Sequence, residues 1–334
     1  MLQWDDDLRV AGTPLYLDSR RPRPVCVVSH AHSDHLPNGG VHGHAYATAA
    51  TAELAEYRVG MTAVTRLGYR TDHAFDPDTR LRLTPAGHVL GSAMVRVERP
   101  EGSLLYTGDF KLRPSLTVEQ ADPEPADVLV MESTYGLPMF RFPDWRQTQA
   151  RLAEAVAGAL AAGRQPIVMG YSLGKAQEIV RILTDHGLPV TCHGAVHALN
   201  GIYERLGVPL GPYRRYKAED FHGPAALDLA ERGALVAPPQ VARSAFVSRF
   251  DDPLTIMMTG WALQPNARFR YGVELALPLS DHADFDELLE LIERVSPRKV
   301  YAHHGYREFV GELRKRKIDA VLARPEAQLK LFEE

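Results

Sequence analysis

The stretch that decides the fold is Ser29-His30-Ala31-His32-Ser33-Asp34-His35, which directly follows the apolar run Pro24 to Val28. The run predicts a strand, so the string after it is a loop that presents three imidazoles and a carboxylate within six residues. Neutral nitrogen and anionic oxygen are the donors that Zn²⁺ takes in proteins. His30 and His32 can face one ion while Asp34 and His35 turn toward a second, so the stretch predicts a metal-binding loop.

Two further donors occupy the same kind of position, each just past a predicted strand. His88 stands in Ala86-Gly87-His88-Val89-Leu90-Gly91-Ser92, and Asp109 stands in Tyr106-Thr107-Gly108-Asp109-Phe110. Gly87 and Gly108 allow the backbone to turn tightly beside a bound ion. Either donor alone would be read as a structural histidine or a turn cap, whereas together with the loop at His30 they indicate one metal centre.

Short apolar runs in the first third predict strands, and longer helical segments begin near Asp144. The predicted strands are Leu8–Val10, Pro14–Asp18, Pro24–Ser29, Leu81–Thr84, Met94–Val97, Leu104–Thr107, Val128–Met131, Pro166–Gly170, Leu254–Thr259 and Lys299–His303. The predicted helices are Trp145–Ala162, Lys175–Asp185, Asp284–Val295 and Arg307–Arg316. Strands that alternate with helices in the middle of the chain are typical of βαβ units, so we expect an α/β protein with a parallel sheet there.

The composition is that of an ordinary folded protein of about two domains, with 334 residues, 45% of them apolar, and a net charge of −4. Residues 145–250 contain 12 Lys+Arg and 8 Asp+Glu, whereas the remainder is acidic, which indicates an inserted module. No long apolar stretch and no basic leader is visible, so we expect a cytoplasmic protein without membrane contact. Cys26 and Cys192 lack partner spacing and are read as buried thiols, with a disulfide or a zinc role as the alternative.

Four later strings distinguish between kinds of metalloenzyme. They are Met131-Glu132-Ser133-Thr134-Tyr135-Gly136, Gly170-Tyr171-Ser172-Leu173-Gly174-Lys175-Ala176-Gln177-Glu178, Ser280-Asp281-His282-Ala283-Asp284 and His303-His304-Gly305. With the HxHxDH string, they resemble the motifs of the β-CASP nucleases of the metallo-β-lactamase fold. The resemblance implies an αββα sandwich formed by residues 1–144 and 251–334, with the β-CASP domain inserted as residues 145–250. Asp18 resembles the early aspartate of that fold, which buttresses the metal loop.

The resemblance also implies two divalent metal ions, zinc first and manganese as an alternative. One ion would be held by His30, His32 and His88, the other by Asp34, His35 and His304, and Asp109 would bridge them. In this hypothesis the two metals activate a hydroxide that hydrolyses a phosphodiester. Asp34, Glu132 and His282 take the catalytic positions, and His282, poised by Glu132, protonates the leaving oxygen. His303 is the poorer match and is read as structural.

The branch of the family is indicated by Gly260-Trp261 and by the overall length, which resemble the bacterial ligase-associated DNA exonucleases of the Artemis-type branch. This implies a DNA repair exonuclease, with 5′ to 3′ action favoured, associated with an ATP-dependent DNA ligase and a helicase. His304 is a departure, because that branch often lacks a histidine there. The first alternative is a ribonuclease that processes or degrades RNA. A small-molecule hydrolase and a non-catalytic scaffold are the less favoured alternatives.

Contacts to the nucleic acid are predicted in the inserted module. Ser172 and Lys175 open a predicted helix and would take a phosphate, or else they belong to an ordinary capped helix start. Arg243 is one of several basic residues in or beside loops, with aromatic residues between them. The others are Arg214, Arg215, Lys217 and Arg249, and the aromatic residues are Tyr213, Tyr216 and Phe246. This combination is typical of single-strand binding, although most such residues are simply solvated.

Overall fold

The computed structural model describes residues 1–4, 6–224 and 226–323. The chain forms two compact units, one made of Met1–Arg141 with His282–Glu334 and the other of Phe142–Asp281. Both contain helices and sheets, which confirms the predicted α/β class. Residues 324–334 of the predicted returning segment 251–334 lie outside the described residues.

In its described residues, the first unit contains two sheets and three helices. One sheet has six strands in the order β1-β2-β3-β4-β5-β6: β1 (Leu2–Trp4), β2 (Leu8–Val10), β3 (Leu15–Leu17), β4 (Val25–Val27), β5 (His44–Ala47) and β6 (Val64–Arg66). The other has seven in the order β19-β18-β11-β10-β9-β8-β7: β19 (Ala320–Leu322), β18 (Lys299–Gly305), β11 (Val128–Ser133), β10 (Gly102–Tyr106), β9 (Ala93–Arg99), β8 (Thr79–Pro85) and β7 (His73–Asp76). The helices are α1 (Ala49–Val59), α7 (Phe285–Val295) and α8 (Arg307–Lys315).

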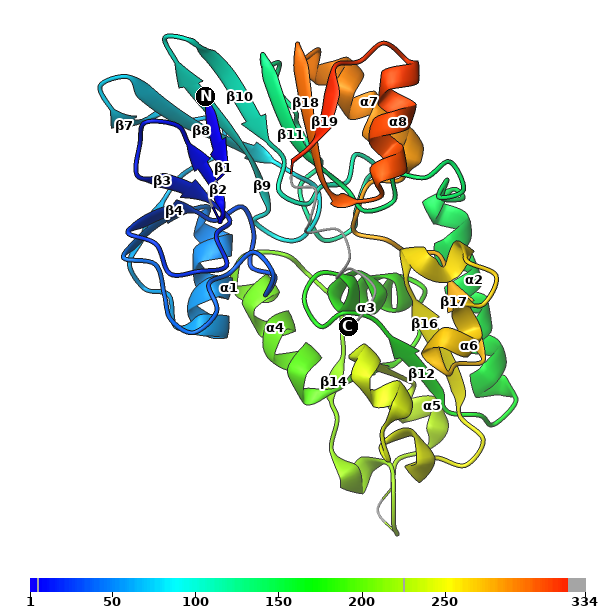
Figure 1. The fold of residues 1–334 in the computed structure, drawn as a ribbon. Helices are drawn as coiled ribbons and strands as arrows, with labels where there is room; N and C mark the ends of the chain where they lie inside the picture. Colours follow the sequence, from blue (N-terminus) through cyan, green and yellow to red (C-terminus); the bar gives the residue numbers. More distant parts are fainter. Residues whose placement is uncertain (5, 225, 324–334) are drawn as a thin grey trace. The chain divides into compact units, whose positions relative to one another are not determined.

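Two apolar clusters explain how these layers pack. Leu17 and Val27 of the six-stranded sheet share one buried cluster with Val95 of the seven-stranded sheet, so the two sheets face each other. A second cluster joins strands of the seven-stranded sheet to Leu291 of α7 and Leu313 of α8. Figure 1 shows these two helices beside β18 and β19. Burial of both clusters removes apolar surface from water and holds the strand ends in fixed positions.

The loops that carry the predicted metal ligands begin at these strand ends and bind to one another through their backbones. The amide of Lys111, two residues past Asp109, donates to the carbonyl of Ala86 over 3.0 Å. The carbonyl of Gly91 accepts hydrogen bonds from the hydroxyls of Thr48 and Thr51 at the start of α1. The loop that contains His88 is therefore fixed on both of its sides.

The second unit has a six-stranded sheet whose strand pairs are all parallel, as the βαβ pattern predicts. The order is β14-β13-β15-β12-β16-β17: β14 (Arg214–Arg215), β13 (Val190–Cys192), β15 (Ala234–Ala237), β12 (Pro166–Met169), β16 (Leu254–Met258) and β17 (Leu275–Leu277). The helices are α2 (Trp145–Ala161), α3 (Lys175–Asp185), α4 (Gly194–Arg205), α5 (Leu229–Arg232) and α6 (Ala267–Tyr271). Short 3₁₀ turns are η1 (Ala218–Asp220), η2 (Pro239–Arg243), η3 (Val247–Arg249) and η4 (Gly260–Leu263).

The end of the second unit differs from the predicted insertion, residues 145–250. The unit runs from Phe142 to Asp281, because β16 pairs with β12 and β17 pairs with β16 in the same sheet. Composition alone does not detect this, since strands buried in a parallel sheet carry almost no charge.

The ten predicted strands and four predicted helices are all present, with ends shifted by a few residues at most. Two longer helices, α1 and α4, were not predicted: α1 is rich in alanine and α4 contains Asn200 and Gly201, so neither has a clear amphipathic period. Cys26 and Cys192 are buried free thiols, as predicted. Among the described residues, no helix has the length and apolar character needed to cross a membrane.

A substitution at Gly87 tests how much stability depends on the close approach of the loop with His88 to the loop with Asp109. Its φ is +77°, and a Cβ built there would lie 2.2 Å from the carbonyl oxygen of Lys111. We expect Gly87→Ala to lower the free energy of unfolding by about 2 to 4 kcal/mol, because it adds an overlap to a left-handed backbone. Urea denaturation measures this change.

The matched control is Gly163→Ala, because Gly163 has a φ of +76° and a Cβ added there would have no other atom within 4 Å. The control should lose only about 1 to 2 kcal/mol, the cost of the left-handed backbone itself. Equal losses in the two variants would show that the loops do not depend on this contact.

Candidate metal centre

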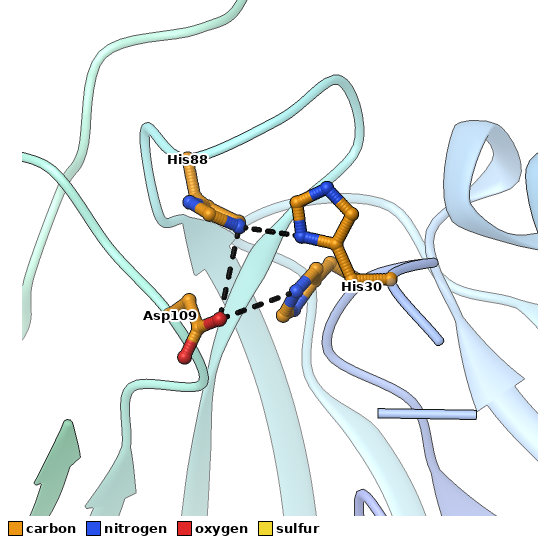
Figure 2. Close-up of side chains that lie close together, drawn as sticks. His30, His88 and Asp109 are labelled. Carbon is orange, nitrogen blue, oxygen red and sulfur yellow. Dashed lines mark hydrogen bonds and ion pairs between the residues drawn. The ribbon is translucent and has the colours of Figure 1, made fainter. Parts of the chain in front are cut away.

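The loops after β4, β8 and β10 bring His30, His32, His88 and Asp109 together. One ligand atom of each lies within 4.8 Å of those of the other three. Nε2 of His88 is 2.9 Å from Nδ1 of His32, and Nε2 of His30 is 3.6 Å from Oδ2 of Asp109. Figure 2 shows His30, His88 and Asp109 turned toward one another. The structure thus joins the three histidines predicted for one ion to the predicted bridging carboxylate.

A second group lies around the same carboxylate. Ligand atoms of His35, Asp109 and His304 lie within 4.8 Å of one another, and Nε2 of His35 is 3.2 Å from Oδ2 of Asp109. Asp109 therefore belongs to both groups. Asp34, predicted for this second ion, stands beside the group rather than in it: its Oδ2 is 3.8 Å from Nε2 of His35, and its side chain is 57% exposed.

Two buried atoms provide a test of whether these residues suit a metal. Nε2 of His30 and Oδ1 of Asp109 have no hydrogen-bond partner among the described residues. Leaving a buried donor or acceptor unpaired is costly, so native structures rarely do it without an ion, a water or another group. Imidazole nitrogen with carboxylate oxygen is a donor set that suits Zn²⁺ or Mn²⁺. The residues present fit a divalent cation.

Asp18 fixes the orientation of the loop that contains His30 to His35. Its carboxylate accepts hydrogen bonds from the backbone N–H of Ser29 over 2.7 Å, from the hydroxyl of Ser29 and from the hydroxyl of Tyr106 over 2.9 Å. It also lies 2.7 Å from Nδ1 of His35. With Nδ1 so engaged, Nε2 of His35 is directed toward Asp109. This matches the buttressing role that the resemblance implies for Asp18.

The charges in the cluster favour ionised carboxylate beside imidazole. Burial lowers the pKa of His30 well below its usual value, and His35 and His88 act in the same direction. Burial would raise the pKa of Asp109, but the positive charges of His35 and His282 outweigh it and hold that pKa well below the usual range. His35 differs: burial would lower its pKa, but Asp109, Asp34 and Asp18 together raise it well above the usual value. In the metal-free protein, therefore, the neighbouring carboxylates favour the protonated form of His35.

Glu132 and His282 form a hydrogen-bonded pair next to the cluster. Glu132 is fully buried at the end of β11, and its Oε1 is 2.9 Å from Nδ1 of His282. Its carboxylate also accepts from the backbone N–H of Phe110 over 2.9 Å and from the hydroxyl of Thr134 over 2.5 Å. The imidazole of His282 lies 4.6 Å from that of His88, measured between ring centroids. The predicted pairing of these two residues is thus present beside the metal cluster.

Two supporting residues were not predicted. Tyr106 stands just before the Gly-Asp motif, which was the only available signal. No sequence signal indicated Arg113. Its Nη2 donates to the carbonyl of His282 over 2.5 Å, and its Nη1 donates to Oε2 of Glu287 over 2.6 Å. His303, read as structural, stacks on Tyr106 with ring centroids 5.8 Å apart.

Two of the residues predicted to contact nucleic acid in the second unit have surroundings that do not favour phosphate binding. Lys175 is 3% exposed and its Nζ is 3.0 Å from Oδ2 of Asp281, which argues against a role as phosphate ligand. Ser172 is half-buried before α3, and its carbonyl accepts from Gln177, as in an ordinary helix start.

The basic residues of this unit are better placed than its aromatic ones. Arg243 is exposed, although one of its nitrogens donates to the carbonyl of Arg270. Arg214, Arg215, Lys217 and Arg249 are also exposed. Tyr216 and Phe246 instead pack against a buried apolar cluster, so they present little surface for stacking on bases.

Comparison with known proteins gives relatives over nearly the whole chain. Residues 269–320 match a family described as the Zn-dependent metallo-hydrolase RNA specificity domain. A probable DNA ligase of Opitutus terrae is 37% identical over 319 residues, which are 95% of this chain and 30% of that protein. An RNase J-like protein of Methanocaldococcus jannaschii is 23% identical over 84% of this chain and 81% of its own length. The transcription termination factor FttA of Methanothermobacter thermautotrophicus is 29% identical over 53% of this chain and 34% of its own.

Asp18→Asn tests the support beneath the metal loop. Asp18 has a φ of 44°, which asparagine tolerates, so the variant removes the charge and one of the two acceptor oxygens without adding backbone strain. We expect the affinity for Zn²⁺ to fall about 10-fold to 100-fold, as is usual when the partner of a ligating histidine is lost. Competition with a chromophoric chelator measures it.

The matched control is Asp252→Asn, because Asp252 has a φ of 43° and an exposed carboxylate in the second unit. Its Zn²⁺ affinity should equal that of the unchanged protein. If Asp18→Asn also kept that affinity, the support assigned to Asp18 would be refuted.

The raised pKa of His35 predicts how metal binding depends on pH. A ligating imidazole must be neutral, so metal binding competes with the proton that the raised pKa of His35 favours. The affinity should therefore rise with pH and fall as the solution is acidified. Titration calorimetry of Zn²⁺ binding in two buffers of different ionisation enthalpy counts the protons released. Equal heats in both buffers would contradict the prediction.

Proposed function

Because the chain belongs to the β-CASP nucleases of the metallo-β-lactamase fold, we propose that it hydrolyses phosphodiester bonds in DNA as a metal-dependent exonuclease of repair. Digestion from the 5′ end is the favoured polarity. The observation that supports catalysis most directly is the Glu132–His282 pair, held 2.9 Å apart beside a histidine and carboxylate cluster with unpartnered buried atoms.

His30, His32 and His88 would hold one divalent metal ion, zinc first and manganese as the alternative, with Asp109 shared between this ion and a second. His35 and His304 would hold the second ion, with Asp34 beside them. Bound ions of this kind supply Lewis acidity toward phosphoryl oxygens and lower the pKa of water. These two sets of ligands are proposed because the ligand atoms within each group lie within 4.8 Å of one another.

His282 would supply the proton that the leaving oxygen needs. Its Nδ1–H donates to the carboxylate of Glu132, so Nε2 is the nitrogen that would exchange a proton with substrate. The buried carboxylate fixes the orientation of the ring, while Phe110 and Thr134 fix the carboxylate. Hydrolysis then needs a proton at the leaving oxygen when the bond to phosphorus breaks, and His282 provides it.

Support for DNA comes from the relative in Opitutus terrae, which is named a probable DNA ligase and is 37% identical over 95% of this chain. The chain spans only 30% of that relative's length. We therefore propose that it acts together with an ATP-dependent DNA ligase on the same DNA. Association with a helicase and a cytoplasmic location remain predictions from the sequence.

The second candidate is a ribonuclease. It is favoured by the match of residues 269–320 to a family described as an RNA specificity domain. The relatives named RNase J-like protein and RNase aCSPSF2 also support it. The same cluster and the same Glu132–His282 pair would serve either substrate, because the phosphodiester chemistry is shared.

His282→Ala tests the proton donor. We expect the variant to retain the metal content of the unchanged protein but to lose about 100-fold to 10,000-fold in kcat, the usual contribution of general acid catalysis. Metal analysis and steady-state hydrolysis measure the two properties. His222→Ala, which changes an exposed histidine of the second unit, is the control and should keep kcat. A fully active His282→Ala enzyme would end the assignment of His282 as proton donor.

The substrate is tested by digesting matched DNA and RNA strands that carry a label at the 5′ or the 3′ end. The proposal predicts mononucleotides from DNA, with the 5′ label released first, and no release when Asp109→Ala replaces the unchanged protein. Cutting of RNA alone would instead establish the ribonuclease. No metal-dependent cutting of either strand would refute nuclease activity.

A further inference from the structure

Arg113 connects the loop that follows Asp109 to the segment that begins at His282, and both belong to the first unit. Its guanidinium makes two contacts with that segment. Nη2 donates to the carbonyl of His282 over 2.5 Å, and Nη1 donates to Oε2 of Glu287 in α7 over 2.6 Å. The side chain of Arg113 is 16% exposed and that of Glu287 is 11% exposed. The ion pair is therefore largely shielded from water.

Glu287 fixes the guanidinium from the helix side. Its Oε1 accepts from the backbone N–H of Arg113, and its Oε2 accepts from the backbone N–H of Asp284 over 2.9 Å. Asp284 in turn caps α7, because its Oδ1 accepts from the backbone N–H groups of Asp286 and Glu287, each over 3.0 Å. The carboxylate of Glu287 thus binds both the backbone and the side chain of Arg113, so the guanidinium has a defined position.

The peptide group between His282 and Ala283 is bound at both of its polar atoms by the loop after Asp109. Arg113 donates to its carbonyl, and the carbonyl of Phe110 accepts from its N–H over 2.6 Å. Because a peptide group is planar, two such contacts fix the orientation of the plane and hence the chain direction at His282. The ring of His282 is held separately, through Nδ1, by Glu132.

The stability of α7 does not account for the guanidinium. The capping box of Asp284 and Glu287 already satisfies free N–H groups of the first turn. Burial of a charged side chain beside it costs desolvation energy that can exceed the attraction within the ion pair. What arginine adds is geometry, because its planar fork presents donors in fixed directions, here toward a carboxylate and a carbonyl.

We propose that Arg113 is a positioning residue, which orients the peptide group after His282 and thereby keeps the imidazole of His282 in place beside the loop of Asp109. The inference rests on the proposed function, in which His282 donates a proton to the leaving oxygen. Arg113 itself does not touch the reacting atoms. A displacement of about 1 Å in a reacting group can lower the rate about 100-fold, so the loss of this restraint should be measurable.

Arg113→Lys tests this role, because lysine keeps the positive charge opposite Glu287 but lacks the planar fork that reaches both acceptors. The protein should fold and keep the metal content of the unchanged protein. On DNA, kcat should fall about 10-fold to 100-fold while KM changes less than about 2-fold, because misplacing the donor affects the transition state and not substrate binding. Should this variant not fold, the double variant Arg113→Gln, Glu287→Gln replaces it, with the same expected results.

A second measurement uses a phosphodiester whose leaving group needs no proton, the p-nitrophenyl ester of thymidine 5′-phosphate. Because its departing anion is stable, general acid catalysis contributes little, and Arg113→Lys and His282→Ala should both stay within about 3-fold of the unchanged rate. An equal loss on DNA and on the ester would show that Arg113 acts on the fold or the metal ligands and would overturn the proposal. A raised KM with unchanged kcat would overturn it too, because it would indicate contact with the substrate.

The matched control is Arg141→Lys, the same exchange at an arginine that also pairs with a carboxylate of α7. Nε of Arg141 is 2.8 Å from Oδ2 of Asp286, but this pair lies at the surface, with both side chains at least half exposed. The kcat of the control should equal that of the unchanged enzyme on both substrates. Unchanged kcat on DNA in Arg113→Lys would contradict the positioning role.

A third readout does not require nuclease activity. Proton NMR of histidine-labelled protein should show the Nδ1–H of His282 as a slowly exchanging signal that is absent from His282→Ala, because it donates to buried Glu132. In Arg113→Lys this signal should broaden or disappear, while Arg141→Lys keeps it. An unchanged signal in Arg113→Lys would overturn the proposal. If the unchanged protein cut no nucleic acid, the proposed function would fail, and this signal alone would decide the inference about Arg113.

Discussion

Burial of several imidazoles around the single carboxylate of Asp109 is the constraint on which the rest of the structure depends. Desolvation opposes every charge in such a cluster, and the protein leaves Nε2 of His30 and Oδ1 of Asp109 without a hydrogen bond among the described residues. A divalent cation would satisfy both atoms at once. The surrounding architecture keeps these donors in place.

That organisation uses rigid elements at each level. The two facing sheets fix the ends of β4, β8 and β10, and Gly87 lets the His88 loop contact the loop that follows Asp109. Asp18 then sets the direction of His35 through Nδ1. Glu132 does the same for His282. In each of these two histidines, Nδ1 contacts a buried carboxylate, and this contact fixes the direction in which Nε2 points. The chemistry proposed for the chain follows from this repeated arrangement.

Much of the site was predictable because its residues follow strand ends in short motifs. The string from His30 to His35, His88, Asp109 and the Glu132–His282 pair each stand at a strand end or a helix start. What the sequence did not reveal are partners that come from distant segments. Arg113 and Tyr106 act through contacts with residues 169 and 88 positions away, and no local pattern indicates such contacts.

The same limitation explains where the structure differs from what the sequence suggests. Lys175 stands at a helix start, which suggested a phosphate ligand, but its partner Asp281 lies more than 100 residues further along the chain. The predicted insertion ended at residue 250 because charge marked its first part only, whereas β16 and β17 belong to the same parallel sheet. Asp34 satisfies the motif, but its side chain is half exposed and its Oδ2 is 3.8 Å from Nε2 of His35.

The central claim is that one carboxylate, Asp109, is shared by two metal ions. It is tested most directly by anomalous diffraction at the zinc edge from crystals of the chain grown with Zn²⁺. The account predicts two peaks about 3.5 to 4 Å apart, one beside His30, His32 and His88 and the other beside His35 and His304, both in contact with Asp109. An absence of peaks at the cluster, or zinc bound only elsewhere on the protein, would contradict it.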